Sequence, residues 1–289
     1  MTDPGIHEVH YRVISDRNNR SGGQDCEWHV YSAVNFAEDH FSSHASDYAA
    51  HRPTYPAALF DYLASLCPTQ DLAWDCATGN GQAAILLADH FASVIATDAS
   101  APQVEAATSH PNVRYETAPA EASPLATDSV DLVTVAQAAH WFDLDAFYRE
   151  TERVLKPSGV LALWCYGLAK VTTRIDALIE NFFSETVGSY WPDKRSHIDN
   201  GYTFLTFPYA SLATPRFEMK LTWTVDQCLA YLQTWSAVKR YEAEVGINPT
   251  DALQGPLSSA WGERERSVEW PLTLKVAQPE NGLRLPDQA

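Results

Sequence analysis

Two aspartates and two glycines between positions 75 and 98 have types and spacing that suit nucleotide chemistry. Asp75 opens the turn 75–81, which reads DCATGNG and contains Gly79 and Gly81. Asp98 ends the next apolar run, 19 residues after Gly79. Glycines let the backbone turn tightly and approach a ligand, and an acid about 20 residues further on suits a pair of ribose hydroxyls. This spacing indicates a nucleotide-binding turn.

The charges around the turn select among nucleotides. With Ala84 in the third small position, the segment also satisfies the loose dinucleotide fingerprint G-x-G-x-x-A. Asp75, however, lies where a pyrophosphate would approach, and a carboxylate repels phosphate and attracts a cation by about 4 kcal/mol at ~4 Å near a protein surface. No Lys or Arg occurs from Asp71 to Ser100. A ribose-bearing cation without phosphate fits better, and S-adenosylmethionine, with its ammonium and sulfonium groups, is one.

Three alternatives stay open at this point. Asp75 and Asp98 are also residue types that cap turns between strands and helices, although this interpretation is weaker for both acids with glycines between them. A nicotinamide-dependent oxidoreductase would use a similar glycine turn, but Asp75 and the absent basic residues disfavour it. A non-catalytic nucleotide-binding protein of the same fold is the third.

The pattern around the turn predicts alternating strands and helices. After a helix behind Pro56, strands are expected at 72–75, 94–98, 113–117, 130–136 and 159–166, with helices at 82–90, from about 102, and at 143–155. Short apolar strands that alternate with helices form a parallel sheet covered on both faces. The sequence therefore predicts an α/β fold with a doubly wound, mostly parallel sheet.

The first and last parts of the chain follow other patterns. Residues 1–39 are polar and predict an N-terminal extension without an assigned role, and residues 40–289 predict one large α/β domain. Helices are expected at 175–187 and 224–245, with an aromatic stretch between them. This stretch predicts a lid-like insertion at about 168–225, after which a strand at about 270–276 would complete the sheet edge.

Composition disfavours several classes of protein. Hydrophobic residues make up 45% of the 289 residues, which indicates a packed core. The net charge of −17, with 20 Lys and Arg spread along the chain, argues against a nucleic-acid partner. Five cysteines without a C-x-x-C pair predict neither a metal site nor a disulfide framework. Without a signal sequence or a long apolar run, we expect a cytoplasmic monomer or homodimer that spans no membrane.

Several further segments resemble one family. They are YAAHRPTYP at 48–56, AE at 120–121, QAAHWFD at 137–143, RVLKPSG at 153–159 and TWS at 234–236. With the glycine turn and Asp98, they make residues 41–276 similar to the class I S-adenosylmethionine-dependent methyltransferases, and within these to the small-molecule branch that includes trans-aconitate methyltransferase-like enzymes. The glycine turn is generic to the superfamily, whereas HWF and the Arg52-Pro53 box are more specific. Cys76-Ala77 departs from the pattern of many relatives.

The resemblance implies a Rossmann-like fold and a set of cofactor contacts. Asp75 would lie near the cofactor's ammonium, the backbone of Gly79 would approach the ligand, and Asp98 would bind the ribose. The other implied contacts are Ala120 and Glu121 beside the adenine, Tyr48 and Arg52 on the methionine carboxylate, and Ala77, Ala99, Gln103 and Gln137. An Arg suits a carboxylate because its planar fork matches it. Arg52 in an ordinary surface salt bridge and Glu121 as a solvated loop acid are the alternatives.

The acceptor side of the expected site centres on His140. It follows the fourth strand at the carboxyl edge, where open α/β sheets bind ligands. It is a candidate catalytic base, but orienting the acceptor and packing at the lip of the crevice are equally open roles. Four aromatic residues are expected to wall the acceptor pocket, although each alone also fits burial in the core: Trp141, Tyr190, Trp191 and Trp235. The predicted function is methyl transfer from S-adenosylmethionine to a small molecule, with O-methylation of a carboxylate or hydroxyl favoured.

Overall fold

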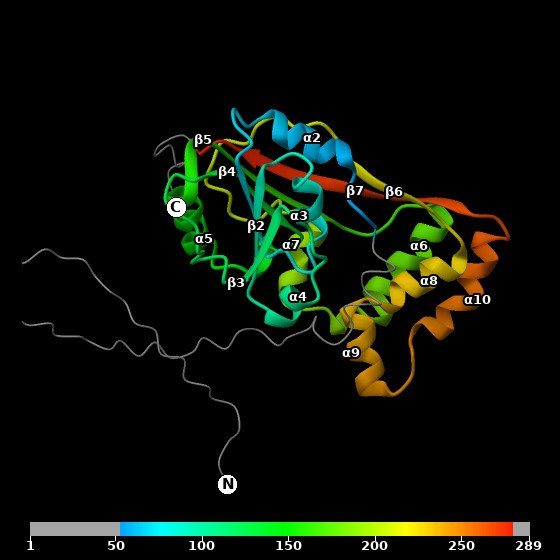
Figure 1. Cartoon of the computed structure of the whole chain (residues 1–289). Helices are drawn as coiled ribbons and strands as arrows, with labels where there is room; N and C mark the ends of the chain where they lie inside the picture. Colours follow the sequence, from blue (N-terminus) through cyan, green and yellow to red (C-terminus); the bar gives the residue numbers. More distant parts are fainter. Residues whose placement is uncertain (1–52, 280–289) are drawn as a thin grey trace, which may run out of the picture. The chain divides into compact units, whose positions relative to one another are not determined.

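The computed structural model describes residues 53–279, which all belong to one compact unit (Figure 1). The expected N-terminal extension and the implied cofactor contacts Tyr48 and Arg52 lie outside the described residues. Among residues 53–279, every helix is too short or too polar to span a lipid bilayer.

A seven-stranded sheet runs through the described residues. Its strands are β1 (Leu72–Cys76), β2 (Ser93–Asp98), β3 (Val113–Thr117), β4 (Val130–Ala136), β5 (Leu155–Tyr166), β6 (Glu218–Trp223) and β7 (Arg266–Ala277). They lie in the order β3-β2-β1-β4-β5-β7-β6. The first five strands pair in parallel, whereas β7 is antiparallel to both β5 and β6. The predicted doubly wound, mostly parallel sheet is confirmed.

Helices cover both faces of this sheet. They are α2 (Ala57–Ser65), α3 (Gln82–Leu87), α4 (Ala101–Glu105), α5 (Leu144–Val154), α6 (Thr173–Asn181), α7 (Ser196–Asp199), α8 (Val225–Gln233), α9 (Ser236–Val245) and α10 (Thr250–Trp261). Short irregular turns of helix are η2 (Ala139–Trp141), η3 (Phe182–Thr186), η4 (Gly188–Tyr190) and η5 (Asp193–Arg195). The N-cap of α5 is Asp143, whose Oδ1 accepts a hydrogen bond from the Ala146 N–H at 3.1 Å, so one of the backbone donors at the start of the helix is satisfied.

Two buried clusters lie on opposite faces of the sheet because neighbouring strand residues point in opposite directions. Ala73 of β1 belongs to the cluster that includes α2 and α3, whereas Trp74 belongs to the cluster that includes α5 and α7. Phe147 of α5 is fully buried and lies 6.4 Å from Trp74 between ring centroids. Burial of one such side chain stabilises the fold by roughly 1.5–3 kcal/mol.

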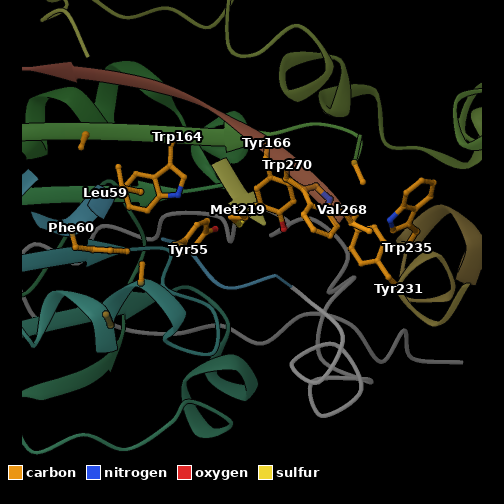
Figure 2. Close-up of a cluster of buried hydrophobic side chains, with 14 of the residues drawn as sticks. Tyr55, Leu59, Phe60, Trp164, Tyr166, Met219, Tyr231, Trp235, Val268 and Trp270 are labelled. Carbon is orange, nitrogen blue, oxygen red and sulfur yellow. The ribbon is translucent and has the colours of Figure 1, made fainter. Parts of the chain in front are cut away.

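The C-terminal third forms a helical group beside β6 and β7. Figure 1 shows α6, α8 and α10 gathered at this end of the sheet. Figure 2 shows the aromatic core that joins the two regions, from Trp164 and Tyr55 to Trp270, Tyr231 and Trp235. Strand β6 falls inside the range expected for the lid and belongs to the sheet, and α10 was not anticipated.

The continuous helix expected at 224–245 is wrong, because α8 ends at Gln233 and α9 begins at Ser236. Thr234 closes α8, since its hydroxyl donates to the carbonyl of Tyr231 at 2.7 Å and its N–H donates to the same oxygen at 3.0 Å. A side chain that bonds its own preceding turn competes with helix continuation. The backbone is then extended at Trp235.

Candidate active site

The candidate site lies where the strand order reverses. In the sheet, β2 and then β3 lie on one side of β1, and β4 and then β5 lie on the other. Ligands of open α/β sheets bind outside the carboxyl ends of the strands at such a switch point. The turn 77–81 after β1 and the segment 137–141 after β4 both start there.

Asp98 fixes the glycine turn. Its Oδ2 accepts a hydrogen bond from the Gly79 N–H and its Oδ1 accepts one from the Ser100 N–H, both at 2.9 Å. Gly79 has φ +57°, a left-handed conformation that side chains disfavour. The acid predicted for the ribose and the glycine predicted for backbone approach are therefore neighbours across 19 residues of sequence.

The residues around this turn fit a ribose-bearing ligand. Among residues 53–279, the nearest neighbour of a Cβ built on Gly79 would be Gln103 Oε1 at 3.8 Å, so these residues leave the backbone open to approach. Asp98 is partly exposed, and the buried Ser100 hydroxyl has no hydrogen-bond partner in the described structure. The Asp98 carboxylate and the Ser100 hydroxyl thus lie at the carboxyl end of β2, hydrogen-bonded or adjacent to the backbone of the glycine turn.

Asp75 is fully enclosed at the end of β1. Its Oδ2 accepts a hydrogen bond from the Thr78 hydroxyl at 2.6 Å, and its Oδ1 accepts one from the Thr134 hydroxyl at 2.8 Å. Burial raises its pKa to about 6, although the two threonine hydroxyls act in the opposite direction. The carboxylate thus ties β1 to β4, a role that the implied ammonium contact did not anticipate.

Tyr115 supports the turn from β3 and was not singled out from the sequence. Its hydroxyl donates to the Thr108 carbonyl at 2.8 Å. Gly81 has φ +89°, and a Cβ there would lie 2.9 Å from Tyr115 Cζ and still closer to its hydroxyl oxygen. Only glycine fits at position 81 without a shift of Tyr115.

Two implied cofactor contacts have protein partners of their own. Glu121 Oε1 accepts a hydrogen bond from the Asp143 N–H at 2.9 Å, next to the buried Ala120. Gln137 has φ +60°, and its side-chain amide donates to the Tyr166 carbonyl and accepts from the Tyr166 N–H, both at 2.9 Å. The Gln137 amide therefore extends the β4–β5 pairing, and its contact with a cofactor stays a prediction, as do those of Ala77 and Ala99.

His140 forms a buried pair with Tyr202. Its Nδ1 lies 3.3 Å from the Tyr202 hydroxyl oxygen. Either the Tyr202 hydroxyl donates to Nδ1, or a protonated Nδ1 donates to the hydroxyl oxygen, according to the tautomer of the imidazole. Tyr202 is fully buried with φ +56°, and the sequence prediction did not include it.

The environment of His140 keeps the imidazole neutral. Burial lowers its pKa to about 3, and the positive charges of Arg195, His197 and Lys194 add to this effect. A general base works best when its pKa lies near the operating pH. Of the three roles left open for His140, its surroundings favour orientation of the acceptor or packing over proton abstraction.

This pKa predicts an acid-dependent loss of stability. Between pH 6.5 and about 3 the unfolded chain binds a proton at this histidine that the native state excludes, so the contribution of His140 to stability falls as the pH falls below 6.5. From pH 6.5 to 5 the loss is about 1.5 kcal/mol. Denaturant unfolding of wild type and His140→Gln at both pH values measures it. Asp75 titrates in an overlapping pH range in both proteins, so the informative quantity is the difference between their losses of unfolding free energy from pH 6.5 to 5. We expect a larger loss in wild type than in His140→Gln. Equal losses in the two proteins contradict the assignment.

The four predicted pocket aromatics divide into groups. Trp141 lies 4.8 Å from the His140 ring, beside the switch point. The ring centroids of Trp191 and Trp235 lie 5.5 Å apart. Tyr190 instead packs against Tyr241, with 5.1 Å between the ring centroids. Trp235 is buried in the core, in line with the alternative stated for each aromatic alone.

Comparisons with known proteins agree with this geometry. A family model described as a methyltransferase domain matches residues 74–163. A protein of Dictyostelium discoideum named as a methyltransferase is 37% identical over 220 residues, which cover 75% of this chain and 82% of that protein. A solved structure named as a type II methyltransferase of Anaeromyxobacter dehalogenans is 40% identical with a TM-score of 0.74, and the match covers 78% of this chain and 97% of that chain. A methyltransferase-like protein of Schizosaccharomyces pombe is 29% identical over 214 residues, or 71% of this chain and 80% of that protein.

Proposed function

We propose that this chain, which belongs to the class I S-adenosylmethionine-dependent methyltransferases, transfers the methyl group to an oxygen atom of a small molecule. We place the chain in the branch that resembles trans-aconitate methyltransferase-like enzymes. The observation that carries the proposal is the neutral, buried His140–Tyr202 pair beside Trp141, which follows β4, the strand paired with β1. With the Tyr202 hydroxyl donating to Nδ1, the neutral imidazole would carry its proton on Nε2 and would donate it to an acceptor oxygen.

The cofactor is S-adenosylmethionine, and we propose which residues hold it. Asp98 would bind the ribose hydroxyls, Gly79 would let the backbone approach, and Ala120 with Glu121 would flank the adenine. Asp75 would act through its hold on Thr78 and Thr134, which fixes the turn, and through its charge near the ammonium. The roles proposed for Gly79 and Asp98 are supported by the open space at the Gly79 backbone and by the partly exposed carboxylate of Asp98.

In the proposed reaction, the protein positions the acceptor atom and excludes water from the site. Bound S-adenosylmethionine supplies an electrophilic methyl group on its sulfonium. Holding an acceptor atom about 3 Å from a reacting carbon and in line with the leaving group supplies much of the rate. Trp141 and Phe142 would exclude water, and His140 would orient the acceptor oxygen. Residues 168–225, apart from β6, would act as the lid over the crevice.

Labelled S-adenosylmethionine tests this proposal. Wild-type enzyme is incubated with the methyl-labelled cofactor and a metabolite extract, and the label is followed into small-molecule, protein and nucleic-acid fractions. We expect label in small molecules, and mild alkali separates methyl esters, which release it, from methyl ethers, which keep it. Label confined to macromolecules contradicts the proposal. Binding without any transfer supports the non-catalytic alternative instead.

His140→Gln separates orientation from base catalysis. If His140 only orients an already ionised carboxylate, kcat falls by less than about tenfold and the loss appears mainly in KM. If it removes a proton, turnover falls by about 10²–10⁴-fold and a neutral-pH limb disappears from the rate profile. Because the pKa of His140 is about 3, we expect the first result. The pH profiles of kcat for wild type and variant provide the measurement.

A further inference from the structure

The turn after α7 contains two successive residues in the left-handed conformation. Gly201 and Tyr202 both have φ +56°. Glycine adopts this conformation readily, whereas a residue with a side chain pays roughly 1–2 kcal/mol for it. Such residues persist only where their surroundings impose the conformation, and they gather at functional sites. The backbone of Tyr202 is therefore held by the contacts around it.

Packing against β7 and bonds to the end of α7 fix this turn. A Cβ built on Gly201 would lie 2.9 Å from Thr273 Oγ1, so the turn lies directly on the strand. The N–H of Gly201 donates to the Ile198 carbonyl and that of Tyr202 donates to the His197 carbonyl, both at 2.8 Å. Because the backbone is held on both sides, the direction in which the Tyr202 side chain leaves the turn is set.

The Tyr202 side chain reaches His140 in the interior. Tyr202 is fully buried and His140 is 6% exposed. The two rings lie 6.1 Å apart between centroids, and His140 Nδ1 lies 3.3 Å from the Tyr202 hydroxyl oxygen. Among residues 53–279, Nδ1 is the only acceptor to which this hydroxyl can donate a hydrogen bond, and Nε2 of His140 has no partner.

The balance of protons favours donation by Tyr202. Burial raises the pKa of the Tyr202 hydroxyl well above its usual value, so the hydroxyl keeps its proton, and the pKa of His140, about 3, keeps the imidazole neutral. With the imidazole proton on Nδ1, the hydroxyl proton would have no acceptor among the described residues. With that proton on Nε2, the hydroxyl and Nδ1 satisfy each other. An unsatisfied buried donor costs about 1–3 kcal/mol, which favours the second arrangement.

We propose that Tyr202 is the positioning residue of His140: its hydroxyl donates to Nδ1 and thereby holds the imidazole with its Nε2 proton directed to the methyl acceptor. The inference deepens the proposed function and rests on it for the acceptor. In this account Tyr202 touches neither cofactor nor acceptor and acts through His140. The left-handed turn at Gly201 and Tyr202 is the backbone arrangement that brings the hydroxyl from the lid range to η2.

Nuclear magnetic resonance of the imidazole nitrogens tests the inference without any acceptor. The enzyme is prepared with isotope-labelled histidine and saturated with S-adenosylhomocysteine, and His140 is identified among the 10 histidines by the signals missing from His140→Gln. In wild type near neutral pH we expect a protonated Nε2 and an unprotonated Nδ1. In Tyr202→Phe, which removes only the hydroxyl, we expect a mixture of the two tautomers. A proton on Nδ1 in wild type, or an unchanged tautomer in Tyr202→Phe, overturns the proposal.

Kinetics then show whether Tyr202 acts through His140. Tyr202→Phe should raise the acceptor KM by about 3- to 10-fold, the scale of one hydrogen bond between neutral groups, and should change kcat less than KM. In a His140→Gln background the same substitution should change KM by less than about twofold, because the side chain through which it acts is gone. Equal losses in the two backgrounds contradict the assignment.

Tyr148→Phe is the matched control for loss of a buried tyrosine hydroxyl. The Tyr148 hydroxyl donates to the Thr206 carbonyl at 2.5 Å, in the same segment as Tyr202, and forms no hydrogen bond with His140. This variant should keep the acceptor KM and the Nε2-protonated imidazole of wild type. A KM loss in Tyr148→Phe equal to that in Tyr202→Phe would mean that both hydroxyls only stabilise the lid range.

Failure of this inference is distinguishable from failure of the proposed function. The affinity for S-adenosylhomocysteine should stay within about twofold of wild type in every variant, because no substituted side chain belongs to the glycine turn. An imidazole tautomer that depends on Tyr202, without methyl transfer to small molecules, contradicts only the proposed function. Methyl transfer to a small-molecule oxygen by an enzyme whose His140 carries its proton on Nδ1 contradicts only the role of Tyr202.

Discussion

Replacement of Asp98 by alanine is expected to weaken binding of S-adenosylhomocysteine by about 10- to 150-fold, which corresponds to roughly 1.5–3 kcal/mol for hydrogen bonds to a charged group. The carboxylate is expected to bind the ribose, and it also holds the Gly79 and Ser100 N–H groups. Its removal therefore costs a ligand contact and loosens the turn that presents the cofactor. Isothermal calorimetry on the folded variant measures the loss.

Two controls separate these contributions. Asp98→Asn keeps the shape and one acceptor oxygen but loses the charge, so its affinity should lie between those of wild type and Asp98→Ala. Asp89→Ala removes an exposed acid beyond the end of α3 and should bind like wild type. An unchanged affinity in Asp98→Ala, with an unfolding transition like that of wild type, means that Asp98 does not hold the ribose.

Gly81→Ala is expected to lower the free energy of unfolding by about 2–5 kcal/mol. A left-handed φ costs a side chain roughly 1–2 kcal/mol, and position 81 has φ +89°. The added methyl would also collide with Tyr115, whose hydroxyl is fixed on the Thr108 carbonyl, and overpacking of this kind typically costs about 1–3 kcal/mol. Chemical denaturation measures the total, and cofactor affinity should fall with it because the turn must move.

Gly246→Ala isolates the backbone part of this cost. Gly246 ends α9 with φ +78°, and a Cβ there would meet no atom of the described residues within 4 Å. Its substitution should therefore cost only about 1–2 kcal/mol. In a Tyr115→Ala background, the cost of Gly81→Ala should fall toward the same value. Equal costs of Gly81→Ala in both backgrounds would show that Tyr115 does not enforce the glycine.

The parts of the fold that local patterns determine could be predicted from the sequence. The buried strands β1, β2 and β4 are near-continuous apolar runs, as expected for parallel strands covered on both faces. Strand β6 was not predicted because its partner, β7, follows more than 40 residues later, so its place in the sheet depends on a distant segment. The break between α8 and α9 depends on the hydroxyl of Thr234, which periodicity does not register.

In the candidate site too, local spacing could be predicted from the sequence, whereas contacts between distant residues could not. Asp98 and Gly79 were predictable because a fixed spacing along the chain brings them together. Tyr202 lies 62 residues from its partner His140, so no local spacing along the chain indicates their contact. The hold of Thr134 on Asp75 likewise joins two strands through side chains 59 residues apart. Spacing rules describe single loops, so contacts between distant loops required the structure.

Competition between S-adenosylhomocysteine and NAD tests most directly that the switch-point crevice is an S-adenosylmethionine site. The wild-type enzyme is titrated by calorimetry with S-adenosylhomocysteine, alone and in the presence of excess NAD. The enclosed carboxylate of Asp75 and the absence of Lys and Arg from residues 71–100 disfavour a pyrophosphate. We therefore predict one S-adenosylhomocysteine site per chain whose affinity NAD does not change. Displacement of S-adenosylhomocysteine by NAD, or tighter binding of NAD alone, would contradict this account.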